Sequence, residues 1–135
     1  MLQFGQCEIS VDTPLIPIKE KRCCLTFRNP KRLQIRRVRV DGCVITDGPR
    51  CDYLLINGDS VEHYVELKGS DVRHALVQLE ATIKKIGNNC LERRAYIAST
   101  QCPMLTTEIQ QKKKYFRQHL RASLTIIKRK HEVDV

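Results

Sequence analysis

The most regular pattern in the chain is a pair of short apolar runs followed by a stretch with helical spacing. The runs CDYLLI (51–56) and HYVELK (63–68) have the length and the aromatic and β-branched content of buried strands. A helix is predicted over residues 71–86, because Ser70 or Asp71 can cap its start and Gly87 can end it. Its buried stripe consists of Val72, Leu76, Leu79, Ile83 and Ile86.

Upstream, KRLQIRRVRV alternates basic with apolar residues and runs into DGCVIT. Asp47-Gly48 favours a tight turn, so strands 36–46 and 49–56 are predicted to pair antiparallel. In that register Cys43 faces Asp52, and Asp41 projects from the same side of the sheet as a further carboxylate. The alternative is that Asp41-Gly42 only lets the strand bend.

The connection between the two apolar runs has two possible registers. A two-residue turn at Asn57-Gly58 places Asp52 opposite His63, whereas a loop from Asn57 to Val61 places it opposite Glu66. A working site in which two carboxylates meet favours the longer loop.

The later chain predicts one more strand, one more helix and a final strand. RRAYIAST is typical of a strand, and Thr107 with Gln110 resembles a capping box at the start of a helix over 106–121. The final strand is predicted to run through Ile127 and then fray. The inward side chains of the helix are Leu105, Ile109, Phe116 and Leu120, and the outward ones are Lys112, Lys113, Lys114, Arg117 and Arg121.

The first 30 residues are broken by Pro14, Pro17 and Pro30, and only CCLTF is assigned there, as a strand. The 135 residues are expected to form one domain, 1–135. There is no run of 18 apolar residues and no secretory start, which predicts a cytoplasmic protein without membrane contact.

A formal net charge of +9 favours a polyanionic partner such as DNA or RNA. The lysine-rich helix face is either an ordinary solvated surface or a phosphate-binding ridge, and the same two interpretations apply to Arg36 and Arg37 on the basic strand. The seven cysteines form no CxxC pair, so we expect them to be reduced thiols rather than a metal cluster.

Asp52, Glu66 and Lys68 interrupt the strands that should be most buried. A buried charge costs several kcal/mol unless it is paired or holds a metal ion. The strand period of two places Glu66 and Lys68 on one face, so a carboxylate and an amine are presented side by side. Chemistry therefore explains these residues better than packing does.

Asp52, thirteen intervening residues, Glu66-Leu67-Lys68 and a following amphipathic helix with Gln78 together resemble the PD-(D/E)XK nuclease superfamily, over about residues 36 to 100. The proline stands at Pro49 rather than directly before Asp52. The resemblance implies an α/β fold with a restriction-endonuclease-like core, in which a central mixed β-sheet is flanked by α-helices. It implies that Asp52 and Glu66 bind Mg²⁺ or Mn²⁺, that Lys68 acts on the attacking water, and that Gln78 supports the site.

The resemblance also implies a further Glu from an N-terminal helix, for which Glu20 and Glu8 are the candidates. The predicted function is metal-dependent hydrolysis of phosphodiester bonds, in DNA rather than RNA, by a homodimer whose contact surface is the N-terminal third or an edge strand at 36–40. One alternative is an accessory subunit that binds nucleic acid without cleaving it. Another is a structural protein in which Asp52, Glu66 and Lys68 form a buried ion network.

Overall fold

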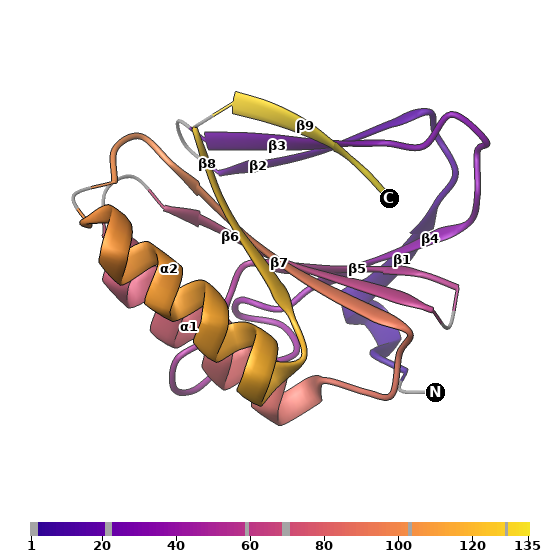
Figure 1. Cartoon of the computed structure of the whole chain (residues 1–135). Coiled ribbons are helices and arrows are strands. Elements are labelled where there is room, and N and C mark those ends of the chain that lie inside the picture. The colour runs from indigo at the N-terminus through magenta and orange to yellow at the C-terminus, as the bar shows by residue number, and fades with distance from the viewer. Residues whose placement is uncertain (1–2, 21–22, 59, 69–70, 103, 129) are drawn as a thin grey trace.

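The computed structural model describes residues 3–20, 23–58, 60–68, 71–102, 104–128 and 130–135, and the side chain of Lys68 lies outside its description. The protein is mixed α/β, with two β-sheets and two helices (Figure 1). Within the described residues, no helix is long and apolar enough to cross a membrane.

A six-stranded mixed sheet forms the centre of the fold, in the order β1-β4-β5-β6-β7-β8. Strands β1, β4, β5 and β6 pair antiparallel, whereas β6, β7 and β8 pair parallel. The strands are β1 (Glu8–Val11), β4 (Ile35–Arg39), β5 (Tyr53–Asn57), β6 (Val61–Lys68), β7 (Glu92–Ser99) and β8 (Ser123–Lys128). The two apolar runs of the sequence are β5 and β6, in the interior of this sheet, where both faces are covered.

The second sheet has three strands, β2 (Leu15–Glu20), β3 (Cys23–Arg28) and β9 (Lys130–Asp134). Strand β2 pairs antiparallel with β3, and β9 pairs parallel with β3. The strand predicted at CCLTF is confirmed as β3. The predicted final strand is also confirmed as β8, but the chain does not fray after Ile127, because β9 returns to pair with the N-terminal third.

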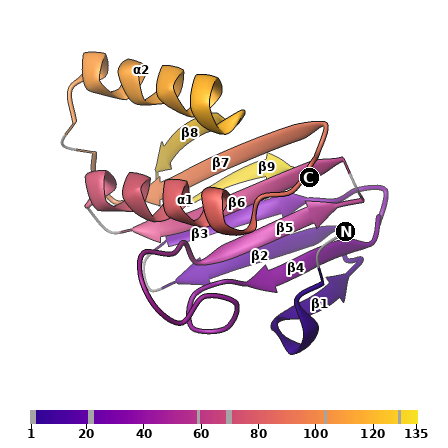
Figure 2. The ribbon, with the colours of Figure 1, turned by 90° about the horizontal axis from the view of Figure 1, so that it is seen from below.

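The three-stranded sheet packs on one face of the six-stranded sheet, and two helices cover the opposite face (Figures 1 and 2). Helix α1 (Val72–Ile86) matches the prediction closely, since the Asp71 side chain accepts a hydrogen bond from the His74 backbone N–H at 3.0 Å and Gly87 follows the last turn. Gly87 is required by close approach: a Cβ there would lie 2.4 Å from the Ile83 carbonyl oxygen.

Helix α2 (Thr106–Tyr115) continues as a π-helical turn, η2 (Phe116–Leu120), so the predicted span is confirmed but its cap is wrong. Leu105 occupies the N-cap position, and no side chain caps the first turn. Leu105 is also 68% exposed rather than inward, whereas Phe116 and Leu120 are buried as predicted.

The core has two parts, one on each face of the six-stranded sheet. Between this sheet and the helices lie Leu54, Tyr64, Leu79, Ile97 and Phe116, with their neighbours. Between the two sheets lies the second part of the core, which includes Phe27, Leu55, Val65 and Tyr96. Side chains at alternate positions of β5 and β6 therefore enter different cores.

The antiparallel pairing of the strands before and after Asp47-Gly48 is confirmed, but the tight turn between them is wrong. Strand β4 ends at Arg39, and the backbone N–H of Val40, not Cys43, donates to the Asp52 carbonyl oxygen at 3.0 Å. The chain leaves the ladder because Gly42, with φ of +75°, allows a turn that closes an isolated bridge between Asp41 and Ile45. Residues 40–52 thus form a long connection leading to Asp52.

Candidate active site

The two carboxylates singled out in the sequence lie at the same end of the β5–β6 ladder, Asp52 directly before β5 and Glu66 on β6. Strand β5 pairs with β6 from Asn57 opposite Val61 to Tyr53 opposite Val65, and the regular pairing ends there. The Asp52 N–H donates to the carbonyl oxygen of Val65, the partner of Tyr53, at 3.1 Å, so Asp52 lies beside the end of the ladder, next to the Val65–Glu66 peptide. The longer of the two loops considered from the sequence is therefore the correct one.

Glu66 faces the helix layer. Tyr64, two residues away on β6, packs in the core under the helices, and side chains two apart on a strand share a face. Asp52 is 8% exposed and Glu66 1% exposed. The Leu67 backbone N–H donates to Asp52 Oδ2 at 2.8 Å, which fixes the carboxylate against the strand that carries Glu66.

Lys68 ends β6 two residues beyond Glu66, and its backbone is paired with Ser99 of β7. Its side chain lies outside the described part of the structure. Ser99 is only 4% exposed and accepts a hydrogen bond from the Gln101 N–H at 3.3 Å. This buried hydroxyl was not predicted from the sequence, although the polar pair Ser99-Thr100 directly after an apolar strand was a signal for it.

Glu62, on the same face of β6, shows how a structural carboxylate is satisfied here. Arg93 donates to it at 2.8 Å, and the Tyr64 hydroxyl and the Asn88 backbone N–H donate to it at 3.2 Å each. The Arg93 guanidinium also donates to the Leu120 carbonyl at 2.7 Å, so this ion pair joins β6 and β7 to the end of η2. Glu62 is thus a cross-link between elements.

Asp41 is not brought to the site in the way the sequence suggested. The register on which that prediction rested is wrong, and the Asp41 carboxylate instead accepts from Arg50 Nε at 2.7 Å, with about half of its side chain exposed (49%). Arg50 also donates to the Gly48 carbonyl. Asp41 and Arg50 therefore brace the connection from β4 to β5.

Gln78 contacts the site from α1, but through a different partner than expected. Its Nε2 donates to the Arg50 carbonyl oxygen at 3.0 Å, two residues before Asp52, rather than to the strand that carries Glu66. The expected support of the site by Gln78 is therefore directed at the backbone leading to Asp52.

The candidates for an N-terminal glutamate lie elsewhere, because the N-terminal third is built of strands and one short 3₁₀ turn, η1 (Gly5–Cys7). Glu8 on β1 accepts two hydrogen bonds of 2.7 Å from Arg36, which lower the pKa of Glu8. Glu20 is exposed at the end of β2 in the other sheet.

The same Glu8 contact changes the role of Arg36, whose guanidinium also lies 5.9 Å from the centre of the Phe4 ring. Strand β4 is interior, between β1 and β5, so the prediction of an edge strand at 36–40 is wrong. Arg37 is partly buried on the opposite face of β4.

The expectation that all cysteines are reduced is wrong for two of them. Cys7 and Cys43 form a disulfide with a Cα–Cα distance of 5.7 Å, which ties η1 to the connection before Asp52. The other five, Cys23, Cys24, Cys51, Cys90 and Cys102, are not disulfide-bonded.

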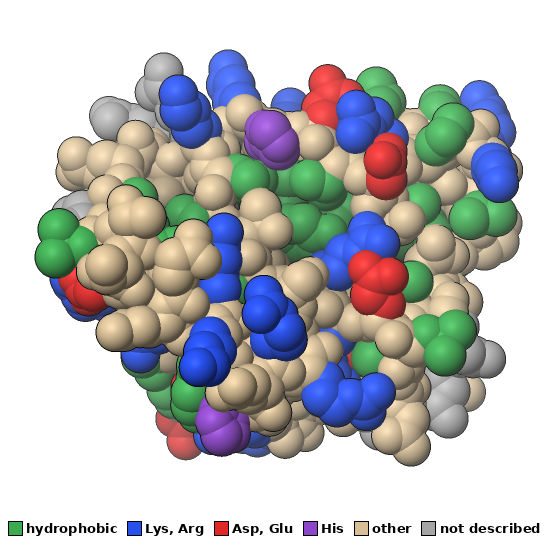
Figure 3. Space-filling view, viewed as in Figure 1, with side chains coloured by type: hydrophobic (Ala, Val, Ile, Leu, Met, Phe, Trp, Pro, Cys, Tyr) green, Lys and Arg blue, Asp and Glu red, His purple; other side chains and the backbone are tan. Residues whose placement is uncertain are grey.

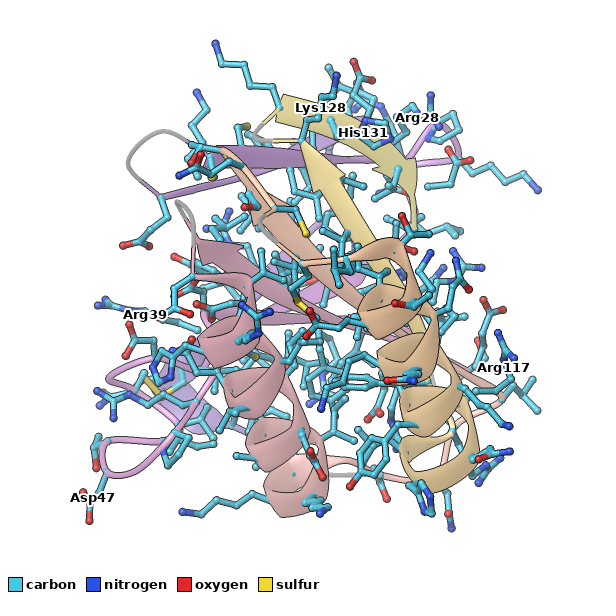
Figure 4. The ribbon with its side chains drawn as sticks, turned by 60° about the vertical axis from the view of Figure 1, so that its left-hand side comes forward. Arg28, Arg39, Asp47, Arg117, Lys128 and His131 are labelled. Carbon is cyan, nitrogen blue, oxygen red and sulfur yellow. A yellow bond between two sulfur atoms is a disulfide. The ribbon has the colours of Figure 1, made fainter. Side chains whose placement is uncertain are left out.

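The predicted basic ridge lies on the second half of α2 and on η2. Lys112, Lys114 and Arg117 are exposed and Lys113 is partly buried. Figure 3 shows Lys and Arg side chains gathered on this side of the molecule. In Figure 4, Arg117 projects away from α1, whereas Arg39 lies on the opposite side of the helix pair. The ridge and the basic strand β4 are therefore separate surfaces.

Comparison with models of known families, with curated proteins and with solved structures gave no match.

The donor set at this site suits a hard metal ion that keeps part of its water shell. Among the described residues no group of three or more His, Cys, Asp or Glu side chains converges. Mg²⁺ commonly uses one or two protein carboxylates and completes its shell with water and substrate phosphate oxygens. Asp52 and Glu66, two hard oxygen donors on adjacent strands, fit that requirement.

Proposed function

We propose that the protein is a metal-dependent nuclease of the PD-(D/E)XK kind, with a restriction-endonuclease-like core. The observation that carries the proposal is the placement of two buried carboxylates at one end of the β5–β6 ladder, Asp52 directly before β5 and Glu66 on β6, with Lys68 two residues beyond Glu66. A cation bound near two buried carboxylates lowers their mutual repulsion and replaces water as a partner of their oxygens.

In this function Asp52 and Glu66 hold Mg²⁺ or Mn²⁺, which supplies Lewis-acid stabilisation of phosphate charge and a water of lowered pKa. The Asp52 carboxylate is oriented for this task by the Leu67 N–H. Lys68 stabilises negative charge on the attacking water or on the phosphate in the transition state. Gln78 supports the backbone before Asp52.

The substrate class follows from charge. A formal net charge of +9 and the exposed basic side chains of α2 and η2 suit the phosphate backbone of a nucleic acid, with DNA favoured over RNA. Cutting both strands of a duplex requires two sites, so a homodimer is part of the proposal. The dimer contact does not use β4, because β4 is paired with β1 on one edge and with β5 on the other. The candidates are β1 and β8, the outer strands of the six-stranded sheet.

The second candidate function is an accessory subunit that binds nucleic acid through the basic ridge, which is separate from β4, and does not cleave it. This function applies if Asp52 and Glu66 prove catalytically inert. The two functions are separated by incubating the protein with duplex DNA, branched DNA, single strands and RNA, each with Mg²⁺ and with EDTA. The nuclease proposal predicts Mg²⁺-dependent cleavage that is lost in both Asp52→Ala and Lys68→Ala.

The two variants are then distinguished by metal binding in calorimetry. Lys68→Ala should keep nearly normal Mn²⁺ affinity while cleavage falls by orders of magnitude, because the amine acts on the reacting groups. Asp52→Ala should lose both. Retained metal binding in Asp52→Ala, together with its loss in Lys68→Ala, would show that the roles are assigned wrongly. Nucleic-acid binding without any cleavage would favour the accessory subunit.

A further inference from the structure

Two side chains of helix α1 form hydrogen bonds with both polar groups of one peptide, the one between Arg50 and Cys51. We call this pair of hydrogen bonds the grip. The carbonyl oxygen of the peptide accepts from Gln78 Nε2 at 3.0 Å, and its N–H donates to Thr82 Oγ1 at 2.8 Å. Gln78 and Thr82 are four residues apart and so lie on the same side of the helix, one turn from each other. No role was predicted for Thr82 from the sequence.

Thr82 is a polar residue in the apolar stripe of α1, between Leu79 and Ile83, and it is fully buried at 0% exposure. Its own hydroxyl proton is donated to the Gln78 carbonyl oxygen at 2.8 Å. With its proton donated there, Thr82 Oγ1 accepts from the Cys51 N–H with a lone pair. The same bond links Thr82 to Gln78, whose side chain donates to the Arg50 carbonyl. A buried hydroxyl is tolerated only where its hydrogen bonds are made, and here both serve this contact.

The gripped peptide is separated from Asp52 only by Cys51, at the point where the long connection from β4 joins the sheet. After it, Asp52 is held by ladder bonds to Val65 and Val40 and by the Leu67 N–H. Before it, residues 46–49 are exposed and make no regular pairing. The grip of α1 therefore fixes the backbone at Cys51, the residue directly before Asp52.

We propose that Thr82, acting with Gln78, is a positioning residue that sets the orientation of Asp52. The catalytic meaning of this inference rests on the proposed nuclease function, whereas the grip itself does not. Thr82 touches no reacting group, and its effect passes through the Arg50–Cys51 peptide to the carboxylate that follows. Without the Thr82 acceptor, the buried Cys51 N–H loses its partner and the peptide is free to rotate.

Two variants of Thr82 separate the hydrogen bond from the shape of the side chain. Thr82→Val keeps the shape and removes the acceptor, and Thr82→Ser keeps the acceptor. We expect Thr82→Val to speed amide hydrogen exchange at Cys51 by about tenfold or more and to weaken Mn²⁺ binding by about tenfold, as loss of one buried hydrogen bond predicts. Thr82→Ser should restore both to within about twofold of the wild type.

Ile83→Val is the matched control, because it removes one buried methylene from the neighbouring position of α1 and leaves the grip intact. It should change neither the Cys51 amide nor the Mn²⁺ affinity by more than about twofold. Gln78→Met should weaken Mn²⁺ binding as Thr82→Val does, and the double variant should fall short of the sum, since both side chains hold one peptide.

The outcomes separate this inference from the proposed function. Equal Cys51 exchange in Thr82→Val and wild type, or an equal loss in Ile83→Val, overturns the grip. Faster Cys51 exchange with unchanged Mn²⁺ affinity overturns its role in positioning Asp52. If the wild-type protein binds no Mn²⁺, the nuclease proposal fails. The positioning role is then decided by the Asp52 carboxyl ¹³C resonance, which should shift in Thr82→Val but not in Ile83→Val.

Discussion

His63 makes the protein sensitive to acid, because it is a titratable ring enclosed between the two sheets. It is 0% exposed, packs edge-on against Phe27 of the second sheet with ring centres 5.1 Å apart, and stacks on Tyr96 at 5.8 Å. Its Nδ1 lies 3.1 Å from the Tyr96 hydroxyl, and Nε2 has no hydrogen-bond partner within the described residues. A proton on this ring would place an ion in an apolar layer.

Burial, with a smaller contribution from the Arg94 charge, lowers the pKa of His63 from 6.5 to about 3, and Glu92 opposes the shift. In the unfolded chain, the His63 ring therefore binds a proton below about pH 6.5, whereas in the folded chain it stays neutral down to about pH 3. Stability is unaffected above pH 6.5 and falls as the pH is lowered through this window. At about 1.4 kcal/mol per pH unit, the loss between pH 7 and pH 4.5 is about 3 kcal/mol.

The assay is urea unfolding, followed by circular dichroism at a series of pH values between 7 and 4.5. His63→Phe removes the titration and keeps a ring in the core, so the free energy of unfolding should depend less steeply on pH by about the amount above. His131→Gln, at an exposed position, is the control and should follow the wild type. Parallel pH profiles for wild type and His63→Phe would show that His63 is not the group whose titration lowers the stability.

Two further predictions concern the disulfide and the basic ridge. Unreduced, denatured protein should show five free thiols, and Cys43→Ala should lower the free energy of unfolding by about 4 kcal/mol, because the cross-link closes a loop over a sequence separation of 36 residues; a count of seven thiols would show that the cross-link is absent. Replacing Lys112, Lys113 and Lys114 by Gln should weaken duplex binding and lower the slope of log affinity against log salt by up to about 3, one for each phosphate that a lysine no longer neutralises. Replacing Lys19 and Lys130, on the three-stranded sheet, should leave that slope unchanged; equal slopes in both variants would make the α2 lysines an ordinary solvated face.

The parts of the fold that the sequence predicted are those governed by local pattern. Strands β5 and β6 are apolar runs because they are interior, and α1 carries its period and its cap in its own residues. The register of β5 on β6 followed from a choice between two loop lengths, and the requirement that two carboxylates meet selected the correct one, with Asn57 opposite Val61.

The parts that failed depend on contacts between distant segments. Asp47-Gly48 has the chemistry of a tight turn, but Gly42 and the Cys7–Cys43 cross-link hold the chain in a longer path. Strand β9 pairs with β3 across about a hundred residues, a partner that no local signal announces. The contacts of Gln78 and Thr82 depend on which backbone the rotation of α1 presents to them.

Paramagnetic broadening by Mn²⁺ shows directly whether Asp52 and Glu66 form a cation site. In a ¹⁵N-labelled sample with substoichiometric Mn²⁺, the amide signals of Asp52, Glu66 and Leu67 should broaden first, and Asp52→Asn should abolish the effect. A site elsewhere would broaden a different set of signals. If only the signals of other residues broaden, or if the broadening is unchanged in Asp52→Asn, the cation does not bind at Asp52 and Glu66.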